Sequence, residues 1–128
     1  MIEKAVCDAL ATVAGLTGGV YVGRAPENTA APFAVVQVNN NGKERAGLRY
    51  DHTATVTAAI YATDKGGGRA VADDCRLALE AVPRNGGGLF DLKIRPRDVS
   101  TRAASRALFL FEIIAPATYA TKKNERED

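Results

Sequence analysis

The residues of this chain best suited to chemistry are one histidine, two cysteines and two serines: His52, Cys7, Cys75, Ser100 and Ser105. Hydrolytic catalysis needs a nucleophile, a base and a group that orients the base. Neither serine stands in the glycine-flanked pattern of a nucleophile elbow, and the cysteines and histidine lack the spacing of metal ligands. The sequence therefore predicts no catalytic constellation and no metal site. We expect His52 to be a solvent-facing or sheet-edge side chain.

Three glycine-containing segments are candidates for phosphate binding, but none keeps the full pattern. Gly42-Lys43 lacks the upstream glycine and the downstream Ser or Thr of a P-loop. The run 66–68 follows a strand pattern and opens a helix, which is the context for anion binding. However, Val71 stands where a dinucleotide fingerprint has its last glycine. The run 86–88 precedes a strand. We interpret these segments as flexible connections and predict no cofactor.

A group of basic residues precedes the last strand pattern: Lys93, Arg95, Arg97, Arg102 and Arg106. Two interpretations stay open. The group is a solvated segment balanced by nearby carboxylates, or it is a patch that faces a partner, since arginine favours interfaces. Contact with DNA is the weaker third alternative, because no aromatic residues alternate with the arginines to stack on bases. The nearby carboxylates are Asp91, Asp98 and Glu112.

Composition narrows the class of protein. A chain of 128 residues suits one domain with one core. Its formal net charge of +2 is too small for a dedicated nucleic-acid binder, and no run reaches the roughly 18 apolar residues of a membrane span. Residues 1–4 do not begin a signal peptide. We therefore expect a cytosolic protein with two free thiols, with a disulfide as the open alternative.

The first half of the chain predicts a helix followed by strands. Apolar residues recur every three to four positions over residues 2–14, as in a helix with one buried face. Residues 20–22 and 33–38 are rich in β-branched residues and predict strands. The segment 39–49 is polar and rich in turn formers, and it is either a projecting hairpin tip or a mobile loop. Residues 50–62 alternate polar and apolar and predict the longest strand.

The second half predicts one more helix and two more strands. Asp64 is a candidate cap for a helix that ends at Pro83. Leu77 lies away from the apolar stripe of that helix, so it is either an incidental exposed residue or a subunit contact. Residues 89–95 alternate as in a strand, and residues 105–115 are apolar on both faces, as in a central strand.

Strands in runs between two helices predict an α+β fold. We expect a single domain over residues 1–116, with an antiparallel or mixed sheet of about four to five strands and both helices packed on one face. Residues 117–128 are then a charged C-terminal tail without fixed structure.

The arrangement of these segments resembles the tail-completion, or tail terminator, family of siphophage-type tails. The features that carry the resemblance are the amphipathic helix 2–14, the turns Arg24-Ala25-Pro26 and Pro32-Phe33, the long strand leading directly into the alanine-rich helix 70–81, and the apolar last strand. The resemblance covers residues 2 to about 116. The chain departs from the pattern in the glycine run 66–68 at the start of the second helix.

The resemblance implies a structural virion protein and not an enzyme. Its subunits would form a hexameric ring on the head-proximal end of the tail, stop polymerisation of the tail-tube protein and dock to a head-completion or neck protein. The expected location is the virion tail, with assembly in the host cytoplasm. The resemblance implies no membrane partner, and DNA would only pass through the lumen of the ring.

Loop length and charge, and not the family, select the candidate interface residues. These are Asn41, Lys43, Glu44, Arg45, Arg49, Leu77, Arg95, Arg97, Arg102 and Arg106. Two alternatives to the tail terminator stay open. One is a head-closure or neck connector protein of the same assembly class, and the other is a small ligand- or nucleic-acid-binding module.

Overall fold

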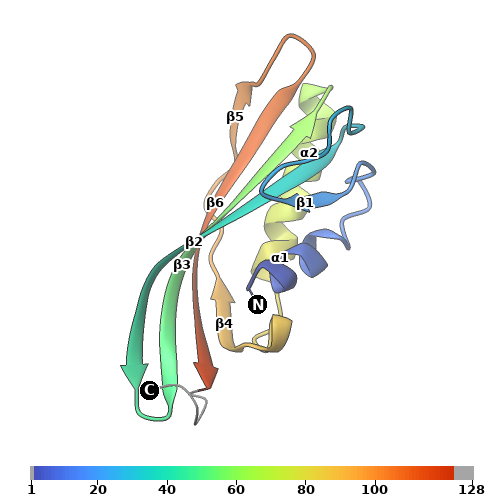
Figure 1. Cartoon of the computed structure of the whole chain (residues 1–128). Coiled ribbons are helices and arrows are strands. Elements are labelled where there is room, and N and C mark those ends of the chain that lie inside the picture. Colours follow the sequence, from blue (N-terminus) through green and yellow to red (C-terminus); the bar gives the residue numbers. More distant parts are fainter. Residues whose placement is uncertain (1, 123–128) are drawn as a thin grey trace.

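The computed structural model describes residues 2–122 and shows a twisted sheet with helices on one side (Figure 1). The elements in chain order are α1 (Ile2–Leu10), β1 (Val20–Val22), β2 (Phe33–Ala46), β3 (Arg49–Ala62), α2 (Lys65–Glu80), the short 3-10 turn η1 (Gly86–Gly88), β4 (Phe90–Ile94), β5 (Ser100–Ala103) and β6 (Phe109–Lys122). The predicted α+β class is confirmed. Half of the predicted charged tail, residues 123–128, lies outside the described part of the chain, and the prediction is wrong for the other half, because residues 117–122 belong to β6.

The sheet is mixed and has six strands, more than predicted. Its strand order is β1-β2-β3-β6-β4, and β5 also pairs with β6. Only β1 and β2 run parallel, and every other pair is antiparallel. Strand β6 therefore lies inside the sheet, as its apolar sequence predicted, and is bordered by β3 on one side and by β4 and β5 on the other.

The core lies between the sheet and the two helices. Asp64 caps α2 as predicted: its side chain accepts a hydrogen bond of 2.6 Å from the Gly67 N–H. The buried residues of α2 recur every three to four positions and lie over the sheet. They are Gly68, Ala72, Cys75 and Leu79. Helix α1 ends at Leu10, four residues earlier than predicted, and its buried face completes the same core.

Strands β2 and β3, together with the end of β6, continue past the helices as a projecting arm (Figure 1). We define the arm as residues 39–53 and 118–122. Every side chain from residue 39 to residue 49 is exposed. Of the two alternatives for segment 39–49, the projecting hairpin is confirmed, but most of this segment is strand and not loop.

The chain reverses later in the arm than its sequence suggested. Among the turn formers of segment 39–49, Asn41-Gly42 does not reverse the chain, and the structure has only a register shift between Asn40 and Gly42. The reversal comes at Gly47, whose φ of 65° suits a residue without a Cβ. A polar stretch that is exposed on both faces carries no alternating pattern, so no strand could be predicted here.

The C-terminal third also contains more strand than predicted. Between the predicted strands 89–95 and 105–115, the structure adds β5, which pairs with β6. The last strand does not end at Ala115 and continues through Pro116 to Lys122. The carbonyl of Pro116 accepts the Arg95 N–H at 2.9 Å, so the proline ring nitrogen faces the irregular link between β4 and β5 and interrupts no pairing with β3.

The two faces of β6 differ in burial, contrary to the prediction that both are covered. Phe111 and Ile113 point toward the helices and are fully buried. On the opposite face Leu110 is buried, but Ile114 is 38% exposed. The helices cover only one side of the sheet, and we call the uncovered side the open face.

Candidate functional site

The two cysteines are free thiols, as predicted, and neither is placed for chemistry. Burial raises the pKa of the Cys75 thiol to about 12, so the thiol stays protonated. Cys7 is half-buried, and burial followed by the charge of Asp8 raises its pKa as well. Within residues 2–122, no three His, Cys, Asp or Glu side chains gather into a potential metal site. The helices in this range are also too short or too polar to cross a membrane.

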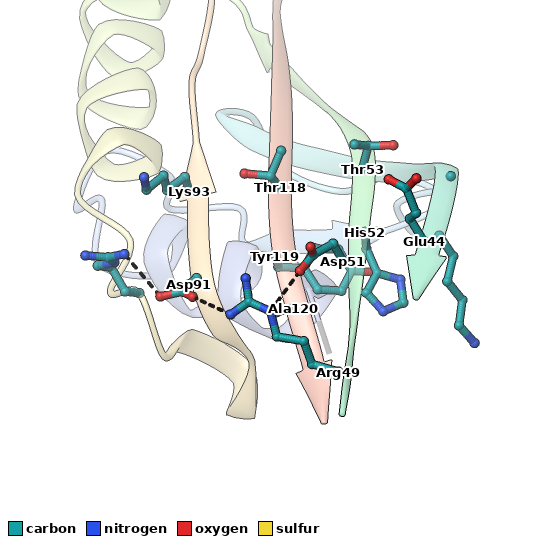
Figure 2. Close-up of a pocket in the computed structure, with 13 residues that line it drawn as sticks. Glu44, Arg49, Asp51, His52, Thr53, Asp91, Lys93, Thr118, Tyr119 and Ala120 are labelled. Atoms are coloured by element: carbon teal, nitrogen blue, oxygen red, sulfur yellow. Dashed lines mark hydrogen bonds and ion pairs between the residues drawn. The ribbon is translucent and has the colours of Figure 1, made fainter. Parts of the chain in front are cut away.

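A cleft of about 660 Å³ lies where the arm meets β4 (Figure 2). Arg49 sits between two carboxylates there. Its Nε lies 3.1 Å from the Asp51 carboxylate, and its Nη1 lies 3.1 Å from Asp91. Arg84 reaches the other oxygen of Asp91, also at 3.1 Å. Asp91 thus ties the arm to the segment before β4, and Arg49 is already engaged within its own chain.

The charges around this cleft nearly balance, which argues against an anion or cation site. The basic side chains are Lys43, Arg49, Arg84 and Lys93, and the acidic ones are Glu44, Asp51 and Asp91. All the ion pairs among them are half-exposed, so each contributes only about 0–1 kcal/mol. The ion pairs of this cleft therefore link the arm to the neighbouring segments.

His52 is a packing residue of the arm. Its ring stacks on Tyr119 at 4.6 Å and 3°, and its Nε2 lies 2.8 Å from the Thr121 hydroxyl. Burial, followed by the charge of Lys43, lowers its pKa, which favours the neutral ring. Of the two alternatives for His52, the edge position is wrong, because β3 pairs on both sides, and the ring is only partly exposed.

The open face carries a second cleft, of about 550 Å³, which the sequence analysis did not identify. Phe33 and Tyr61 stack at 5.0 Å on neighbouring strands and form one apolar wall. Val35, Ala59 and Leu110 extend the apolar surface across β2, β3 and β6. We call this hollow the open-face cleft. Three charged residues also line it: Arg24, Arg102 and Glu112.

The sequence did contain a signal for this second cleft. The pattern of residues 105–115 is apolar on both faces, whereas the helices cover only one of them. Such a pattern is typical of a strand that is buried on both sides. The uncovered apolar residues are therefore an indication that something outside the monomer lies on this face.

The candidate interface residues fall in three separate places. Asn41, Lys43, Glu44, Arg45 and Arg49 are all exposed on the arm. Leu77 is 57% exposed on the outer side of α2.

The four arginines of the last predicted group are exposed along residues 95–106. Arg102 in β5 pairs opposite Leu110, whereas Arg49 in the arm pairs opposite Lys122. Strand β5 and the arm therefore lie at opposite ends of the sheet (Figure 1), whereas Arg95 lies nearer the arm, beside Pro116.

One prominent residue was missed. Leu48, at the tip of the arm, is 83% exposed, more than any other large apolar residue of the described chain. It lay inside a segment that we had interpreted by its polar residues alone.

Fold and surface together define a small α+β protein whose notable features are an arm and an uncovered sheet face, with no cluster of potential metal ligands among the described residues. The comparison with protein families then identifies the group. The family model described as "Tail completion protein gp17" matches residues 4–114, and the chain belongs to this family. The resemblance noted from the sequence is confirmed, and membership gives the chain a structural role in phage tail assembly.

Solved structures support the fold. A chain of the "Virion of native gene transfer agent (GTA) particle" superimposes with a TM-score of 0.58, over 91% of this chain and 84% of that chain. The two sequences are only 12% identical, so this likeness concerns the fold alone. No curated protein sequence matches the chain.

Proposed function

We propose that this chain is a tail terminator: a subunit of a hexameric ring that caps the head-proximal end of a phage-type tail. The ring stops polymerisation of the tail-tube protein and offers a docking surface to a head-completion or neck protein. Family membership and the virion origin of the similar structure support this proposal. The work is done by protein interfaces, without catalysis, in the virion tail and, during assembly, in the host cytoplasm.

The observation that carries the proposal is the arm. Ordering a residue costs about 1–2 kcal/mol of backbone entropy. Residues 39–46 form a strand and residues 47–48 a turn, yet no side chain from 39 to 49 is buried. Such a segment adds little to the stability of the monomer. We therefore infer that it functions by contacting other protein chains.

Ring formation requires two different surfaces on each subunit. In a closed ring, one patch of a subunit contacts a different patch of the next. The arm and the open-face cleft are two such patches, one projecting and one concave, at different places on the sheet. The other partners are then the tube protein and the neck protein, and DNA only passes through the lumen.

The test is to delete the gene in its phage or particle-producing host and to measure tail lengths by negative-stain electron microscopy. We expect overlong tails that are not joined to filled heads, because the stop signal for the tube is lost. Tails of normal length that fail to join heads would assign the chain to head closure. Normal infectious particles would overturn the assembly role and favour a binding module.

A further inference from the structure

The tip of the arm presents a large apolar side chain to solvent. Leu48 follows Gly47 at the chain reversal and is 83% exposed. Burying a leucine side chain contributes about 1.5–3 kcal/mol. Leu48 lies between Gly47 and Arg49 and contributes nothing to its own core. A lone exposed leucine is unremarkable by itself, but its position at the end of a projecting hairpin suits insertion into a hollow.

The open-face cleft is an apolar hollow that could accept a leucine side chain. Its floor is formed by the small side chain of Ala59 between Val35 on β2 and Glu112 on β6, which are its register partners. The stacked rings of Phe33 and Tyr61 form a wall. A volume of about 550 Å³ is ample for a leucine and its neighbours in the turn.

Both the tip and the cleft carry charges of both signs, so individual pairs of opposite charge can form between them, although each surface has an excess of basic residues. Within the described residues, the Glu112 carboxylate has no ion-pair partner, although it is only partly exposed on the open face. Arg45 near the tip is also without an ion-pair partner there. The opposite arrangement exists as well, since Glu44 on the arm and Arg102 at the cleft are likewise unpaired in this part of the chain. Arginine readily forms bidentate pairs with carboxylates.

We propose that the arm tip of one subunit inserts into the open-face cleft of the next copy, with Leu48 over Ala59 and Arg45 beside Glu112. This inference rests on the proposed ring and names its subunit contact. It also accounts for the uncovered apolar face of β6, because the neighbouring arm supplies the missing layer. The contact joins two different surfaces, as a closed ring requires.

The contact can only form between subunits. Leu48 directly precedes β3 and is 11 positions from Ala59, which at a rise of about 3.3 Å per residue is roughly 35 Å. A disulfide requires Cα atoms within about 7 Å. Cysteines introduced at these two positions cannot bond within one chain, so any bond between them reports a neighbour.

The experiment replaces the wild-type gene in the particle-producing host by the double variant Leu48→Cys/Ala59→Cys. Purified tails are oxidised and analysed on non-reducing denaturing gels. We expect a ladder of cross-linked chains that collapses with reductant. Leu48→Cys alone and Ala59→Cys alone control for the native Cys7 and Cys75. Leu48→Cys/Leu77→Cys is the matched control, because Leu77 is exposed on the helical side of the molecule.

The outcomes separate this inference from the proposed function. Absence of the chain from purified tails overturns the terminator role and the contact with it. If the chain is present but Leu48→Cys/Ala59→Cys gives no ladder, the contact is wrong and the terminator role stands. A ladder with Leu77→Cys instead places the arm tip on the helices and also overturns the contact.

Charge reversal provides a second, independent test. Arg45→Glu and Glu112→Arg each place like charges together, and we expect each to lower the yield of joined particles roughly tenfold or more. The combined variant Arg45→Glu/Glu112→Arg restores the attraction between neighbours and should recover most of that yield. Failure of the combined variant to exceed the single variants, with the protein folded, would contradict the pairing.

Discussion

Gly68 explains why a glycine run stands at the beginning of α2. A Cβ at this position would lie 2.4 Å from a ring carbon of Phe111 and 2.7 Å from the Ala62 Cβ. The helix therefore approaches the sheet closely only because residue 68 has no side chain. The glycine run 66–68 departs from the family pattern, and at Gly68 the absence of a side chain allows the helix to pack closely on the sheet.

We predict that Gly68→Ala lowers the free energy of unfolding by about 1–3 kcal/mol, because the methyl group overpacks the interface between helix and sheet. The matched control is Gly66→Ala, where nothing lies closer than 3.9 Å. That variant should be neutral or up to about 1 kcal/mol more stable, since alanine favours the helix. Urea unfolding of the two variants measures the difference. Equal effects would show that the close approach at residue 68 is relieved by movement of the helix.

The buried thiol of Cys75 predicts a pH effect. Its pKa is about 12 in the folded protein and near 9 when exposed. The raised pKa means that the protonated thiol is favoured by folding, so its contribution is complete below pH 9 and declines as pH rises from 9 toward 12. We expect wild-type stability to fall more steeply over this window than that of Cys75→Ala. The free energy of unfolding of both proteins is measured by denaturant titration at several pH values. If it falls equally with pH in the two proteins, the assignment of this effect to Cys75 is wrong.

At the scale of elements, the arm is tied to the body through Asp91, which pairs with both Arg49 and Arg84. We predict that Asp91→Asn lowers global stability by no more than about 1 kcal/mol, because these pairs are half-exposed. Amide hydrogen exchange in residues 43–51 should nevertheless accelerate, since the arm loses its tether. Asparagine tolerates the positive φ of 50° at this position. Asp73→Asn, which breaks a helix-surface pair with Arg69, is the control and should leave exchange in the arm unchanged.

The helices and strands differ in how well they could be predicted from the sequence. The core of β3 and the cap of α2 followed from alternation and from Asp64, because burial on one face leaves a clear pattern. The outer half of β2 could not be predicted, since exposed polar residues on both faces carry no period. The short strand β5 exists only because β6 is beside it, and such tertiary pairing has no local signature.

Pro116 shows that a single residue type does not by itself determine where a strand ends. Proline inside a strand pattern normally marks its end, because it cannot donate to the ladder. Here the missing donor points toward the link between β4 and β5, where no regular pairing is lost. Of the candidate interface residues, the sequence found the polar ones on the arm. It missed Leu48 and the open-face cleft, which only the three-dimensional arrangement brings together.

At the scale of the whole molecule, we expect the rest of the protein to fold without the outer part of the arm. We predict that a chain lacking residues 43–46 and 49–52, rejoined through Gly47-Leu48, folds cooperatively with a loss of about 1–2 kcal/mol, largely from the stack of His52 on Tyr119. No buried residue is removed by this change. In the deletion host the shortened chain should leave tails overlong. Restoration of normal tails by the shortened chain, as by the full-length control, would show that the arm is dispensable.

The position of β6 in the sheet has a consequence for synthesis. Its three partners, β3, β4 and β5, all precede it in the chain, and its pairing with Arg49 spans the sequence to Lys122. While a ribosome is still translating residues 109–122, the nascent chain carries β3 with one edge unpaired. Non-local closure of this kind is slow, and open apolar edges invite aggregation. Translation pauses before residue 109 should therefore lower the soluble yield more than pauses before residue 33.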